Sequence, residues 1–208
     1  MSAFPTERTE HASDYADAYF DHLSAATASI DRAAVEAAAR RIADAAKAGQ
    51  RIYSCGNGGS AAIANHLVCD CMKGIRSDST LRPQVVSLST TVEIITAIGN
   101  DIGYDEVFRF QLESLARKGD VLVAISSSGN SPNIINAIEW AKANGVTTIA
   151  MTGFSGGGAA KLADISLHVD AQNYGIVEDL HQSLMHLLAQ YIRQLHLADP
   201  AAMGTIKF

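Results

Sequence analysis

The features that mark membrane proteins and nucleic-acid-binding proteins are missing from this chain of 208 residues. No apolar run approaches the ~18 residues of a membrane span, and no basic segment followed by an apolar one stands at the start. Sixteen Lys and Arg stand against 22 Asp and Glu, and the net charge of −6 offers no general attraction to polyanions. We therefore expect a soluble cytoplasmic protein that binds neither nucleic acid nor membrane, and that binds any anion at a local site.

Cysteine is also scarce, with only Cys55, Cys69 and Cys71 present. An odd number of cysteines without an export signal argues against a disulfide framework. Cys69 follows His66 by three residues, a spacing that a metal site can use, but small buried cysteines on helices are common. We expect reduced thiols without a role in chemistry.

From Arg51 onward, short β-rich runs alternate with helical stretches, a pattern typical of a parallel sheet with crossover helices. The predicted strands are RIYSCG, QVVSLS, DVLVAIS, TTIAMTG and DISLHV. Alanine-rich helical spacing precedes them in residues 1–48, and a final segment, 176–197, carries apolar residues at i, i+3, i+4 and i+7. We expect one domain over residues 1–208, with N-terminal helices and an α/β core and C-terminal helix over 49–196.

Two glycine-rich or serine-rich loops follow predicted strands and open predicted helices. The first, CGNGGSAA at residues 55–62, has glycines that let the backbone approach an anion, next to a helix start with free N–H groups. The second, SSSGNSPN at residues 126–133, offers hydroxyl and backbone donors without a full positive charge. One such turn also occurs without a ligand, but two at the carboxyl ends of parallel strands converge on one crevice. The pair predicts a phosphate site, whereas the spacing matches neither a dinucleotide-binding nor a Walker loop.

The motifs GNGGSA, AIGND at 97–101 and ISSSGNS together resemble sugar isomerase (SIS) domains, most closely the phosphoheptose isomerases, over roughly residues 35–195. The resemblance implies a flavodoxin-like five-stranded parallel sheet flanked by helices, a homotetramer and a phosphorylated sugar substrate. The expected substrate and phosphate contacts are Asn57, Gly58, Gly59, Ser60, Asp101, Ser126, Ser127, Ser128 and Ser131.

Two helices each offer a histidine and a carboxylate. His66 and Asp70 lie at i and i+4 and so share a helix face, and Glu178 and His186 lie eight residues apart, slightly over two turns. In the resembling family, the positions of Asp70 and His186 are the two proton carriers. All four positions form a metal site there, often with zinc, and two imidazoles with two carboxylates are competent zinc ligands.

The resemblance implies movement of a proton between C1 and C2 of an open-chain ketose phosphate through a cis-enediol, with sedoheptulose 7-phosphate the expected substrate. The sequence departs from the family where Asp70 replaces the usual glutamate, Glu178 the usual glutamine, and Gly175 a common aspartate. Two alternatives remain open. The first is a non-catalytic SIS protein that binds a protein partner, as replication-initiator-binding proteins do, or senses a sugar phosphate. The second is a phosphosugar lyase or one half of an amidotransferase, for which the expected extra domain is missing. All four candidate ligands are present, which favours catalysis.

Overall fold

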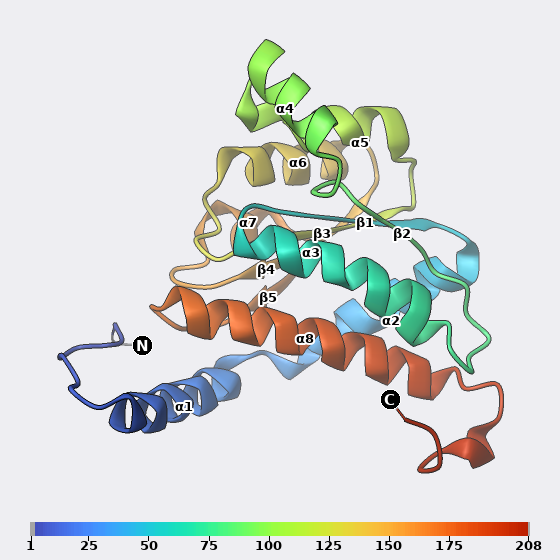
Figure 1. The fold of residues 1–208 in the computed structure, drawn as a ribbon. Helices are drawn as coiled ribbons and strands as arrows, with labels where there is room; N and C mark the ends of the chain where they lie inside the picture. Colours follow the sequence, from blue (N-terminus) through green and yellow to red (C-terminus); the bar gives the residue numbers. More distant parts are fainter. Residues whose placement is uncertain (1–2, 208) are drawn as a thin grey trace.

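A five-stranded parallel sheet forms the centre of the computed structural model, which describes residues 3–207 (Figure 1). Its strand order is β2-β1-β3-β4-β5, and every neighbouring pair is parallel. The strands are β1 (Arg51–Gly56), β2 (Gln84–Ser87), β3 (Val121–Ser126), β4 (Thr147–Thr152) and β5 (Ile165–His168). This order is that of the flavodoxin-like folds, so the predicted fold class is confirmed.

Eight α-helices in the described chain flank this sheet. They are α1 (Ala12–Ser29), α2 (Arg32–Ala48), α3 (Gly59–Cys69), α4 (Val92–Asp101), α5 (Arg109–Leu115), α6 (Pro132–Ala143), α7 (Gly157–Leu162) and α8 (Tyr174–Leu195). Three short helices complete the fold: the π-helix η1 (Asp70–Ile75) and the 3₁₀ helices η2 (Tyr104–Glu106) and η3 (Pro200–Ala202). Among residues 3–207, none of the helices combines the length and the hydropathy needed to cross a bilayer.

The sheet has a hydrophobic core on each face. Val123 and Ile125 of β3 pack with residues of α2, α3 and α8, whereas Leu122 and Ala124 pack with residues of α5 and α6. Figure 1 shows the same two layers, with α2, α3 and α8 on one side of the sheet and α4, α5 and α6 on the other. Because both faces are covered, β3 is buried along its whole length, which explains its nearly continuous apolar sequence.

The switch point of the sheet lies between β1 and β3, which are neighbours in space although β2 separates them in sequence. The helix after β1, α3, belongs to one face and the helix after β3, α6, to the other. The loops at the carboxyl ends of these two strands therefore diverge and leave a crevice, the usual ligand site of such sheets. They are the glycine-rich and serine-rich loops of the sequence.

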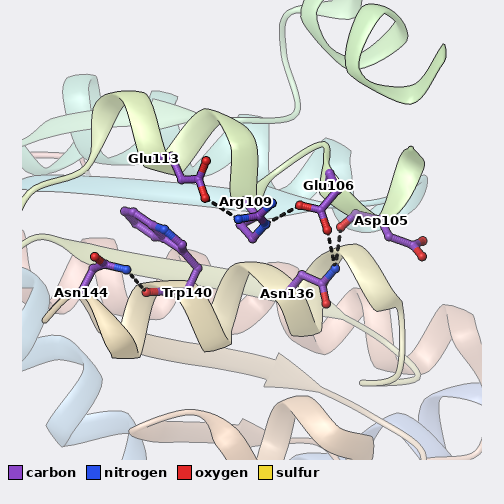
Figure 2. Close-up of polar contacts among 7 residues, drawn as sticks. All are labelled: Asp105, Glu106, Arg109, Glu113, Asn136, Trp140 and Asn144. Carbon is purple, nitrogen blue, oxygen red and sulfur yellow. Dashed lines mark hydrogen bonds and ion pairs between the residues drawn. The ribbon is translucent and has the colours of Figure 1, made fainter. Parts of the chain in front are cut away.

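Polar contacts attach η2 and α5 to α6 (Figure 2). Arg109 of α5 donates to the carboxylate of Glu106, and Asn136 of α6 donates to the same carboxylate at 3.1 Å. The first residue of η2, Tyr104, donates its hydroxyl to Asn57 Oδ1 at 3.0 Å. These contacts position η2 beside the loop that follows β1.

Candidate functional site

A cavity of about 160 Å³ lies at the switch point, between the loops that follow β1 and β3. We call it the serine pocket. Its lining residues are Asn57, Ser60, Ile125, Ser126, Ser127, Ser128, Ser131, Tyr174 and Glu178. Five serine hydroxyls in one small cavity make a hydrogen-bonding site suited to the oxygens of a phosphate.

Glycines shape both loops of the serine pocket. Gly58 precedes α3 with φ of +54°, and Gly129 has φ of +67°, in the left-handed region that suits glycine. A Cβ on Gly129 would also collide with the carbonyl of Gly156. Ser126 accepts the N–H of Gly129 on its Oγ at 3.2 Å, which holds the turn closed.

One hydroxyl of the pocket has no partner among the described residues. The Oγ of Ser127 is buried and makes no hydrogen bond, although buried polar groups in proteins are nearly always paired. Asn57, which also lines the pocket, exchanges two amide hydrogen bonds of 2.9 Å with Asn133. Its side chain is therefore held in place without a ligand. A ligand oxygen in the pocket would satisfy Ser127.

The residues predicted to contact phosphate fall into three groups. Six line the serine pocket: Asn57, Ser60, Ser126, Ser127, Ser128 and Ser131. Gly58 and Gly59 form the turn into α3 and its first residue. Asp101 ends α4 as an exposed residue that accepts a hydrogen bond from Asn100, and it is not among the residues that line this cavity.

Near the end of α3, His66 and Asp70, the first residue of η1, converge with His186 of α8. His186 Nδ1 lies 2.6 Å from Asp70 Oδ2, and His66 Nε2 lies 3.3 Å from Asp70 Oδ1. The two imidazole rings meet edge to face, with centroids 5.1 Å apart. Asp70 is the most buried of the three, at 18% side-chain exposure against 46% for His66 and 41% for His186. The carboxylate therefore bridges two imidazoles that a ligand can still reach.

Gln182 joins this cluster, although the sequence interpretation overlooked it. Its Nε2 lies 2.9 Å from His186 Nε2 and 3.4 Å from His66 Nδ1. It precedes His186 by four residues on α8, so helical spacing alone would have placed it on the same face. With the Nδ1 proton of His186 donated to Asp70, the other ring nitrogen accepts from Gln182, and both nitrogens of a neutral imidazole are satisfied.

The cluster suits a metal ion. One ligand atom from each of His66, Asp70 and His186 lies within 4.8 Å of the other two. Nitrogen and carboxylate donors are the ligands that zinc accepts. Within the described residues, Glu178 does not belong to this group; its side chain lines the serine pocket instead.

His181 lies on another face of α8 and is fully buried. Neither ring nitrogen makes a hydrogen bond of normal geometry within the described chain. Burial lowers the pKa of His181 to about 4 from 6.5; the nearby Thr152 backbone opposes this shift and His168 adds to it. His181 is thus a neutral core residue of the helix that carries the cluster.

The model of the SIS domain family matches residues 14–153, more than half of the chain. The phosphoheptose isomerase of Nitratidesulfovibrio vulgaris is 44% identical over 142 residues, which cover 68% of each chain. The chain belongs to the phosphoheptose isomerase family of SIS domains. The predicted resemblance is therefore confirmed.

Other members of the phosphoheptose isomerase family agree in sequence and in fold. The relative from Akkermansia muciniphila is 40% identical over 162 residues, covering 77% of this chain and 84% of its own. The structure of the phosphoheptose isomerase from Neisseria gonorrhoeae has a TM-score of 0.80 at 34% identity, over 88% of this chain and 98% of that one. The corresponding values for the Francisella tularensis structure are 0.82 and 30%, over 88% and 99%.

Proposed function

We propose that this chain is an aldose–ketose isomerase that interconverts sedoheptulose 7-phosphate and a heptose 7-phosphate. The observation that carries the proposal is the 2.6 Å contact between His186 of α8 and Asp70, the first residue of η1, which continues α3; α3 and α8 also line the serine pocket. Phosphate binding and acid/base groups are thus joined by α3 and α8. Membership of the phosphoheptose isomerase family supports the substrate class.

The spacing along α3 suits a long open-chain sugar. Ser60 faces the serine pocket, and His66 lies six residues further on, about 9 Å along the helix axis. With the phosphate on the serines, the other end of an extended sugar reaches the cluster. Asp70 and His186 also line a larger cavity of about 560 Å³, so the reacting carbons have room beside them.

Asp70 and His186 supply the proton transfers. In the ketose-to-aldose direction, one of the pair takes a proton from C1 while the carbonyl oxygen on C2 gains a proton, which gives the cis-enediol. A proton is then returned to C2 and the C1 hydroxyl loses its proton, which gives the aldose. The substrate and the product therefore have the same atoms. The hydrogen bond between the two side chains orients the imidazole for these steps.

We also propose that His66, Asp70, Glu178 and His186 hold a divalent metal ion, with zinc expected. Three of them converge, and Glu178 joins the set through the family resemblance. A metal bound there would polarise the oxygens on C1 and C2 and stabilise the charge of the enediolate. Elemental analysis of protein purified without chelators tests this, and we expect close to one zinc per chain.

The family resemblance also implies how the chains assemble, and the sequence indicates where the protein is located. We propose a homotetramer, because large apolar side chains on α1, α4 and α8 are exposed in the single chain, among them Phe20, Val92 and Leu195. The proposed location is the cytoplasm. The non-catalytic alternatives are not favoured, since the matched relatives are phosphoheptose isomerases and the acid/base pair is assembled.

Incubation with sedoheptulose 7-phosphate, followed by NMR of the product, tests the proposed reaction. We expect a heptose 7-phosphate to accumulate with the wild-type chain and not with His186→Gln. The matched control is Glu139→Gln, an exposed position on α6 outside the serine pocket and the cluster. No product with the wild type at millimolar substrate would contradict the proposal.

A further inference from the structure

Tyr174 stands at the mouth of the serine pocket. It is the first residue of α8 and, at 63% exposure, the most exposed of the residues that line the cavity. Three serines of the lining lie much deeper, since Ser60, Ser126 and Ser127 are each at most 5% exposed. The buried hydroxyls therefore form the floor of the pocket, and the ring of Tyr174 borders its open side.

Tyr174 also lies at the end of the pocket away from the acid/base cluster. On α8 it precedes Glu178 by one turn, whereas Gln182 and His186 follow Glu178 by one and two turns. Tyr174 and Glu178 line the pocket, and His186 belongs to the cluster. A sugar phosphate that extends from the serines toward His186 therefore has its phosphate, and not its carbon chain, next to Tyr174.

The hydroxyl of Tyr174 is available to such a phosphate. Within residues 3–207 it forms no hydrogen bond, whereas Tyr19, Tyr53 and Tyr104 each donate theirs to a neighbouring oxygen. No Lys or Arg of the described chain lines the cavity, so its side-chain donors are neutral. A phenol is more acidic than an aliphatic hydroxyl and makes the stronger hydrogen bond to a charged phosphate oxygen.

Phe154, in the loop after β4, supports the ring of Tyr174. The two ring centroids lie 4.7 Å apart, with the planes tilted by 59°. The N–H of Phe154 donates to the carbonyl of Ala171, and the N–H of Gly153 donates to the carbonyl of Ser127. Phe154 is thus fixed between the serine loop and the segment that leads into α8.

The backbone of Phe154 has a conformation that aromatic residues rarely adopt. Of the non-glycine residues that the structure describes, only Asp78 and Phe154 have a positive φ, and that of Phe154 is +49°. Aspartate tolerates this region, whereas a bulky residue there is strained. Such strain persists where the surrounding structure imposes it, most often at ligand sites. The contact with Tyr174 connects the strained residue to the wall of the serine pocket.

We propose that Tyr174 is a phosphate-binding residue, whose hydroxyl donates a hydrogen bond to the phosphate at the end of the pocket away from His186. Phe154 is the positioning residue that holds the Tyr174 ring in this place. The inference rests on the proposed phosphate site and adds a donor from α8 to those of the two loops.

Calorimetric titration with two probes tests this role. The probes are inorganic phosphate and ribitol 5-phosphate, which has no carbonyl and so cannot be isomerised. Tyr174→Phe removes only the hydroxyl, Phe154→Ala removes the supporting ring, and a double variant combines the two changes. Phe110→Ala, which removes an exposed aromatic ring of α5 outside the pocket, is the matched control.

We expect Tyr174→Phe to bind both probes about tenfold more weakly, because one hydrogen bond to a charged group is lost. Its kcat with sedoheptulose 7-phosphate should stay near that of the wild type, since the phosphate is remote from the reacting carbons. Phe154→Ala should weaken binding by a similar factor, but it should have little further effect in the double variant, because it acts through the Tyr174 hydroxyl. Phe110→Ala should change neither affinity.

Unchanged binding of both probes by Tyr174→Phe would overturn the inference and leave the phosphate site standing. A loss confined to ribitol 5-phosphate would place the hydroxyl on the sugar and also overturn it. If the losses of the single variants simply add in the double variant, Phe154 does not position Tyr174. If neither probe binds the wild-type chain, the proposed phosphate site itself fails, and the inference fails with it.

Discussion

Asp70 is one methylene shorter than the glutamate usual at this position in the family, yet it reaches both histidines. Its two oxygens lie 3.3 Å from His66 and 2.6 Å from His186. The shorter side chain therefore still contacts both imidazoles, because α8 places His186 within hydrogen-bond distance of Asp70.

Replacing Asp70 with asparagine should remove most of the activity. The amide cannot accept a proton, so we expect kcat to fall by roughly 10²–10⁴-fold, the usual range for a lost general acid or base. The affinity for inorganic phosphate should stay near that of the wild type, because Asp70 does not line the serine pocket. Steady-state kinetics and calorimetry on the same preparation measure both. A fall in phosphate affinity with kcat intact would contradict the assigned role.

Buried His181 should make the fold sensitive to acid. Its folded-state pKa, about 4, is below the ordinary value of 6.5, so the unfolded chain binds more protons between these values. The stability is fully present above pH 6.5 and is lost as the pH falls toward 4, by about 3 kcal/mol in total from this residue. Urea unfolding at a series of pH values measures the slope.

His181→Leu should flatten that pH dependence, whatever its effect on stability at neutral pH. His11→Gln, at an exposed position, is the control and should keep the slope of the wild type. If His181→Leu unfolds with the same dependence between pH 7 and pH 4 as the wild type, His181 does not carry the effect.

Helical spacing predicted part of the cluster, but not all of it. The i, i+4 rule was enough to place His66 beside Asp70, whereas their approach to His186 depends on the packing of α3 on α8 and came only through the family resemblance. Spacing along one helix could not show whether Glu178 faces the histidines or the serines. Asp101 matched a motif, yet the position of α4 leaves it outside the serine pocket.

Among the elements, the serine loop after β3 depends on one glycine. Gly129→Ala would need an L-residue at φ of +67° and would push a methyl group into the Gly156 carbonyl. We expect a loss of about 1–3 kcal/mol in the free energy of unfolding, together with weaker phosphate binding. Urea denaturation and calorimetry provide the measurements.

Gly99→Ala is the matched control for this prediction. It lies inside α4, where an added Cβ would meet only a Tyr104 ring carbon at 3.8 Å. Alanine favours a helix, so this variant should be neutral or stabilised by up to about 1 kcal/mol. Equal stability of Gly129→Ala and Gly99→Ala would show that the loop does not require glycine.

The alternation of β-rich and helical runs was sufficient to predict all five strands and their parallel arrangement. The π-helix η1 was not predicted, because its sequence, DCMKGI, continues the helical pattern of α3. Its wider turn buries Cys71 and Ile75 within the core that includes α8, so packing rather than local propensity accounts for it.

For the whole molecule, we expect four chains to associate. Large apolar side chains on separate helices, such as Phe20 at 63% exposure and Leu195 at 55%, would be covered by contacts between chains. Light scattering at micromolar concentration should give close to four times the chain mass of 22.0 kDa. A stable monomer would contradict this expectation.

The reaction itself is tested most directly by proton exchange with solvent. In D₂O, isomerisation through an enediol exposes the transferred proton to the Asp70–His186 pair, so deuterium should enter C1 of the ketose phosphate and C2 of the aldose phosphate. We expect this exchange with sedoheptulose 7-phosphate and the wild-type chain, and its loss in Asp70→Asn and His186→Gln. Exchange that persists unchanged in both variants, or no exchange in a wild-type chain that binds the sugar phosphate, would show that these residues do not catalyse an enediol isomerisation.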